Sequence, residues 1–60
     1  MKVKINGNDK MEIVGGKVKN AIFENVVFKD TKLVECVLIN CRCLSCGLVN
    51  IKAVNTEIID

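Results

Sequence analysis

Four cysteines are the residues of this chain whose types and spacing could do chemistry. They form a C-x4-C-x-C-x2-C pattern at Cys36, Cys41, Cys43 and Cys46. Four thiolates are a ligand set that suits structural zinc, but the pattern lacks two separated C-x2-C pairs. Free cysteine is also a common small buried residue. Zinc binding, disulfide formation and core packing are therefore three interpretations, and the elements that position the cysteines must decide among them.

The remaining composition offers little catalytic chemistry. The chain has no His, so neither a Cys–His nor a Ser–His pair can form. No glycine-rich phosphate-binding motif is present. We therefore predict a non-enzyme that takes no small-molecule substrate and no cofactor.

A five-residue period organises residues 21–60, which divide into AIFEN VVFKD TKLVE CVLIN CRCLS CGLVN IKAVN TEIID. The first residue of each block is small or β-branched, and the fifth is always polar. The third residue of every block is apolar, and these residues are Phe23, Phe28, Leu33, Leu38, Cys43, Leu48, Ala53 and Ile58. A helix would need apolar returns after three and four residues, and a lone amphipathic strand would need strict alternation. A short strand, a corner at the polar fifth residue and repetition predict instead a chain that winds round an axis.

These blocks, such as ECVLINCRCLSCGLVN, resemble those of the pentapeptide-repeat proteins. The resemblance implies an all-β fold, a right-handed four-sided β-helix with about four blocks per coil. The first and third positions would then face inward, and residues twenty apart would stack, for example Phe28 beneath Leu48. In this frame the four cysteines point inward from different sides. We therefore predict that they pack in the core and form neither a metal site nor disulfides.

The chain is predicted to form a single domain, residues 1–60, in which residues 21–60 supply eight repeats and two regular coils. Residues 1–20 lack the strong repeat. Short strands at residues 2–5 and 11–14, with Asn-Gly between them and Gly-Gly after the second, favour a capping hairpin or meander. Extending the period backwards favours a degenerate coil, with Val3, Ile13 and Val18 inward and Asn8 as the misfit. Both alternatives stay open.

The fourth position of the blocks should face outward, yet it becomes wholly apolar after the first two blocks. A small soluble protein does not usually leave such a band in water, so we predict a protein–protein interface there. With twenty residues per coil, Val34 would stack against Val54 and Ile39 against Ile59. The predicted interface residues are Val34, Ile39, Leu44, Val49, Val54 and Ile59.

The predicted partner is protein, either further copies of the chain or a larger assembly. The net charge of +2 and the scarcity of aromatic residues argue against nucleic acid as a ligand, and no apolar run is long enough to span a membrane. We expect a structural or cementing protein that docks through its apolar flank and open C-terminal coil into an assembly such as a phage or virus-like particle. The expected location is the cytoplasm or a particle assembled there. The alternative, implied by the resemblance, is a regulatory module such as a topoisomerase-binding DNA mimic.

Overall fold

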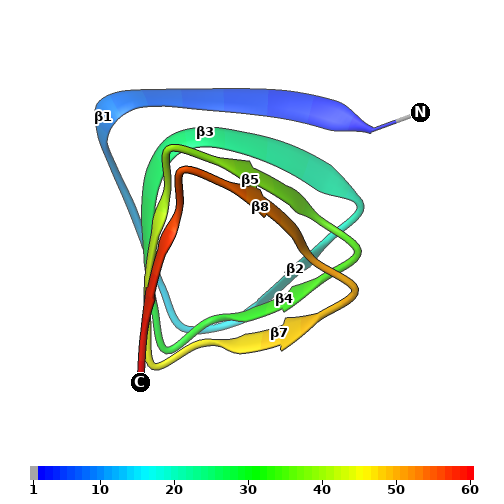
Figure 1. The fold of residues 1–60 in the computed structure, drawn as a ribbon, viewed down its shortest axis with the longest axis vertical. Helices are drawn as coiled ribbons and strands as arrows, with labels where there is room; N and C mark the ends of the chain where they lie inside the picture. The colour runs from blue at the N-terminus through cyan, green and yellow to red at the C-terminus, as the bar shows by residue number, and fades with distance from the viewer. Residues whose placement is uncertain (1) are drawn as a thin grey trace.

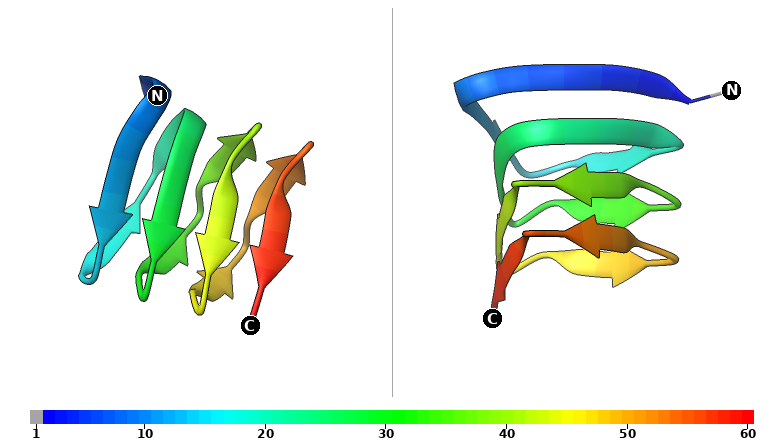
Figure 2. Two further views of the ribbon diagram at one scale, coloured as in Figure 1. Left: turned by 90° about the vertical axis from the view of Figure 1, so that its left-hand side faces the viewer. Right: turned by 45° about the horizontal axis from the view of Figure 1, so that its top comes forward.

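The computed structural model describes residues 2–60, which are wound into a β-solenoid (Figure 1). The strands are β1 (Val3–Val14), β2 (Lys17–Lys19), β3 (Ala21–Lys29), β4 (Lys32–Val34), β5 (Val37–Ile39), β6 (Arg42–Leu44), β7 (Gly47–Val49), β8 (Lys52–Val54) and β9 (Glu57–Ile59). All of the strand pairs among these residues are parallel. The chain winds anticlockwise in Figure 1 while successive coils come toward the viewer, as Figure 2 shows, so the solenoid is right-handed. The predicted all-β solenoid is confirmed.

The coil has three sides and not four, because strand register advances by fifteen residues per coil. Leu33 pairs with Leu48, and Phe28 pairs with Cys43. The predicted stacking of Phe28 beneath Leu48 is therefore wrong, as is the four-sided coil that the resemblance implied. The five-residue period determines the length of one side, whereas the number of sides depends on the angle at each corner.

The strands form three sides of the solenoid. The first side consists of residues 3–6 of β1, residues 21–24 of β3, β5 and β8. The second side consists of residues 11–14 of β1, residues 26–29 of β3, β6 and β9. The third side consists of β2, β4 and β7.

The corners form at the polar fifth residue of each block, as the sequence predicts. The backbone there adopts positive φ, and the fifth-position residues that do so are Asn25, Asp30, Glu35, Asn40, Ser45, Asn50 and Asn55. Asn and Asp reach this left-handed region more easily than other residues with a side chain. The corner N–H also continues the hydrogen bonding between coils, since Asn40 N donates to Val54 O at 2.9 Å.

The core is a narrow triangular column filled by the third-position residues of the three sides. Phe23 and Phe28 are buried, and their rings meet edge to face with centroids 4.9 Å apart. Leu33 from the third side is also fully buried and completes the same coil. Two touching aromatic rings and one leucine therefore fill the interior of one coil. The predicted inward direction of the first and third positions is confirmed in the middle coils.

The N-terminal segment forms a further coil, which confirms the degenerate coil of the two predicted alternatives and rules out the hairpin. β1 pairs in parallel with β3, and Ile13 and Val18 pack against the core as predicted. Val3, however, aligns with Ala21 and is mostly exposed, while Ile5 takes the inward position. The register shifts between residues 6 and 11 because β1 has four residues where β3 has one. Asn8 is a misfit because it belongs to this insertion. Met1 lies outside the described residues.

Candidate functional site

The open coil, formed by β7, β8 and β9, is the candidate docking site. Each of these strands has a paired neighbour on one edge in the described structure, so its other edge presents free backbone groups. Ile58 occupies an inward third position yet is 49% exposed, whereas Phe28 and Cys43 below it in the same column are fully buried. Ala53 is likewise exposed above buried Leu38. The open coil therefore combines unpaired strand edges with an uncovered apolar core.

The six apolar residues predicted to form one interface lie on all three sides. The register pairs Val34 with Val49 on the third side, Ile39 with Val54 on the first, and Leu44 with Ile59 on the second. The predicted stacking of Val34 on Val54 and of Ile39 on Ile59 is wrong, because a coil contains fifteen residues and not twenty. One flat partner surface cannot contact all six residues.

The first side carries a compact apolar patch that includes one of these pairs. Ile22 and Val37 are neighbours in the second position, and Ile39 and Val54 are neighbours in the fourth. We call these four residues the first-side patch. Val54 is 45% exposed and belongs to β8, so the patch runs directly into the open coil. The sequence marked Ile39 and Val54 and placed Val37 near them, but Ile22 joined the patch only once the coil length was known.

Outward charged residues make ion pairs between successive coils. Lys4 lies 3.2 Å from Glu24 on the first side, and Arg42 lies 2.7 Å from Glu57 on the second. At least one side chain of each pair is largely exposed, although Glu24 is only 23% exposed, so each pair contributes little to stability, about 1 kcal/mol or less. The pairs show instead that the outward faces mix both signs of charge.

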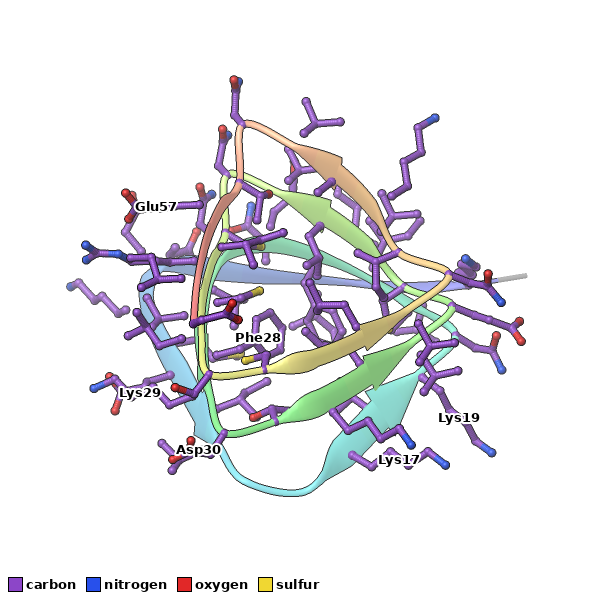
Figure 3. The ribbon with its side chains drawn as sticks, turned by 60° about the horizontal axis from the view of Figure 1, so that its bottom comes forward. Lys17, Lys19, Phe28, Lys29, Asp30 and Glu57 are labelled. Atoms are coloured by element: carbon purple, nitrogen blue, oxygen red, sulfur yellow. The ribbon has the colours of Figure 1, made fainter. Side chains whose placement is uncertain are left out.

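Charge differs between the two ends of the solenoid. Residues 2–20 carry five lysines against Asp9 and Glu12, a balance of +3. Residues 51–60 carry Lys52 against Glu57 and Asp60, a balance of −1. Figure 3 shows Lys17 and Lys19 pointing away from the solenoid at the N-terminal end and Glu57 pointing outward on another side. The ends therefore have opposite charge.

The cysteines lie in the core as predicted, with Cys36, Cys41 and Cys43 buried and Cys46 half-buried. The Cys41 thiol donates to the carbonyl oxygens of Ile39 and Phe23, each at 3.3 Å. Cys36 and Cys46 likewise donate to the carbonyl two residues before them. The thiols at the start of a block thus serve as hydrogen-bond donors at the corners.

Cys43 differs from the other cysteines because it occupies a third position. Burial raises the pKa of its thiol to about 12, with smaller contributions from the neighbouring Cys46 and Cys41. A thiol that resists ionisation is a poor nucleophile and a poor metal ligand at neutral pH. Within residues 2–60 no three His, Cys, Asp or Glu side chains are arranged to hold a metal ion.

Two threonines also donate hydrogen bonds to backbone carbonyls at the corners, a role that the sequence analysis did not predict. The buried Thr31 hydroxyl donates to Lys29 O at 2.9 Å, and Thr56 donates to Val54 O at 3.0 Å. Both also approach a carbonyl of the preceding coil. The available signal was the recurrence of Thr and Cys, both small side chains with a donor, in the first position of five blocks.

The described residues enclose no detectable pocket for a small molecule. Among residues 2–60, no helix has the length and apolar character needed to cross a membrane. In comparisons with known proteins, no family model, no curated protein and no solved structure matches this chain.

Proposed function

We propose that this chain is a non-enzymatic structural protein that docks into a larger protein assembly through its open coil and the adjoining first-side patch. The observation that carries the proposal is the exposure of Ile58. This inward-facing residue is half uncovered, while its equivalents in the two middle coils, Phe28 and Cys43, are fully buried. Covering Ile58, Ala53 and Val54 would remove apolar surface from water and pair three free strand edges.

Docking by strand addition suits this site. A partner that adds strands to β7, β8 and β9 gains backbone hydrogen bonds along each edge, and its apolar side chains continue the core. The absence of His from the sequence and of a pocket in the described residues supports a binding role over catalysis.

The outer faces do not favour the regulatory alternative. A mimic of DNA needs an extended acidic surface, whereas the ion pairs Lys4–Glu24 and Arg42–Glu57 interleave both charges and the chain carries +2 overall. We therefore place the chain among cementing proteins of a cytoplasmic assembly, of which a phage or virus-like particle is one example.

Sedimentation of the chain from cells that express its native gene tests the proposal. The wild-type chain is expected to migrate with a particle much heavier than 6.6 kDa. Ile58→Lys puts a charge in the uncovered core and should release the chain to the light fractions. Val27→Lys, an outward change on β3 away from the open coil, is the matched control and should leave the chain in the heavy fractions. Equal sedimentation of wild type and Ile58→Lys would disprove docking through the open coil.

A further inference from the structure

We propose that the open coil is covered by a second copy of this chain, which stacks its β1 and β2 edges on β7, β8 and β9 and continues the solenoid head to tail. The inference rests on the proposed function, because it names the protein that docks at the same coil. Strands β1 and β2 form the opposite open edge of the described structure, and all observed strand pairs are parallel.

The spiral of the chain determines how the second copy must sit. β9 lies on the second side, so the next strand along the spiral belongs on the third side, against β7. An incoming copy therefore places residues 3–6 on β7, residues 11–14 on β8 and its β2 on β9. Each copy is turned by one third of a turn relative to its neighbour, and the contact repeats without closing into a ring.

This arrangement joins the two uncovered ends of the core. The inward residues at both ends are half-buried or exposed in the single chain. Stacking removes them from water and restores the surroundings that Phe28 and Leu38 have in the middle coils. The inward contacts between copies are Ile5 on Leu48, Ile13 on Ala53, and Val18 on Ile58.

The same register brings opposite charges together on the outside. Glu12 of one copy lies over Lys52 of the other, and Lys17 lies over Glu57, at the interstrand spacing of about 4.8 Å. Glu57 already pairs with Arg42 inside its own chain, so Lys17 extends an alternating ladder. The net charges of the two ends, +3 and −1, favour the same orientation.

Other end-to-end arrangements lack this complementarity. Two N-terminal ends would bring together ten lysines, five from each copy. Two open coils related by a two-fold axis through β8 would place Lys52 opposite Val54 and Glu57 opposite Val49, with no ion pair and with antiparallel strands. The charges therefore select the head-to-tail contact.

Sedimentation equilibrium of the purified chain between about 1 and 500 µM is the primary test. The weight-average mass is expected to rise through successive multiples of 6.6 kDa as the concentration increases. A mass that stays at one chain, or that stops at two, overturns the proposal.

Charge reversal identifies the contact. Lys17→Glu and Glu57→Lys each replace an attractive contact by a repulsive one, and each should weaken association about five- to tenfold at low salt. An equimolar mixture of these two variants restores opposite charges at every junction and should associate like wild type. Lys10→Glu, an exposed lysine with no partner in this register, is the matched control. Failure of the mixture to recover association overturns the register.

These results separate the inference from the proposed function. If the purified chain stays single while Ile58→Lys still leaves the heavy fractions in cells, the partner is another protein and the inference is wrong. If Ile58→Lys remains in the heavy fractions, the proposed function is wrong whatever the mass of the purified chain.

Discussion

At the residue scale, the solenoid depends on a backbone conformation that most side chains disfavour. The fifth residue of the first seven blocks has φ near +50°, and Asn and Asp fill most of these positions. Glu35 and Ser45 are exceptions, with φ of 52° and 55°. Their local preference opposes the corner, so the surrounding hydrogen bonds and packing must hold them there.

Exchanging residue types between two corners tests this explanation. Glu35→Asn should raise the free energy of unfolding by about 0.5–1 kcal/mol, because Asn tolerates positive φ better than Glu. Asn40→Glu, at the same φ of 52°, should lower it by a similar amount. Urea unfolding followed by far-UV circular dichroism measures both changes, at high salt to screen the altered charge. If both variants change the free energy of unfolding in the same direction, the backbone preference of the corner residue is not the cause.

The buried thiol of Cys43 predicts a loss of stability in alkaline solution. Its pKa rises from 9.0 to about 12 on folding, so the unfolded chain releases this proton at lower pH than the folded chain does. The contribution of Cys43 to the free energy of unfolding is fully present below pH 9 and is lost as the pH rises toward 12. The free energy of unfolding falls by at most about 1.4 kcal/mol per pH unit over this range because of Cys43.

The measurement compares wild type with Cys43→Ala. Unfolding free energies taken by urea titration between pH 8.5 and 11 should fall more steeply for wild type than for the variant. The variant starts from a lower stability, because it leaves a small cavity. Parallel curves would show that other groups cause the alkaline loss.

At the element scale, β1 differs from the other strands through its insertion between residues 6 and 11. Gly7 is buried where the chain leaves the first side. A Cβ at this position would lie 2.6 Å from Met11 Cβ and 2.7 Å from Asn25 O. The insertion therefore requires a residue without a side chain at its start.

Replacing two different glycines by alanine separates the effect of this close approach from the general effect of replacing a glycine. Gly7→Ala should lower the free energy of unfolding by about 1–3 kcal/mol, because the backbone must shift to relieve the overlap. Gly47→Ala lies on the outer face, where the nearest atom would be Lys32 Cγ at 3.7 Å, and should be neutral or slightly stabilising. Urea midpoints of the two variants check the prediction, and equal midpoints would contradict it.

The elements also show how far sequence reasoning reaches. The columns of apolar third residues and polar fifth residues predict both the inward core at Phe28 and Leu38 and the corners at Asn25 and Asn40. These features are local, since each block repeats them. The insertion in β1 was visible only as the misfit of Asn8, because three extra residues shift the five-residue frame once, before residue 11, and leave no repeated signal.

At the scale of the whole molecule, the number of sides could not be predicted from the period. Three blocks per coil and four blocks per coil place the same residues inward and outward, and they differ only in which residues stack. That difference decided the candidate site, because it separated Val34 from Val54 and united Ile39 with Val54. The register also distributes the six residues of the predicted apolar flank over all three sides.

Pairs of engineered histidines distinguish the two coil lengths directly. Val34 and Val49 are paired neighbours on the outer face of the third side, so Val34→His with Val49→His should create a two-imidazole site for Ni²⁺. At a metal concentration 100-fold above the dissociation constant, binding should stabilise this variant by about 2.7 kcal/mol.

Val34→His with Val54→His, twenty residues apart, is the matched control and should gain nothing, because these positions lie on different sides. The native chain contains no His, and the parent protein measured with Ni²⁺ accounts for any binding by its cysteines. Thermal unfolding with and without metal gives the answer, and stabilisation of the 34/54 variant instead would restore the four-sided coil.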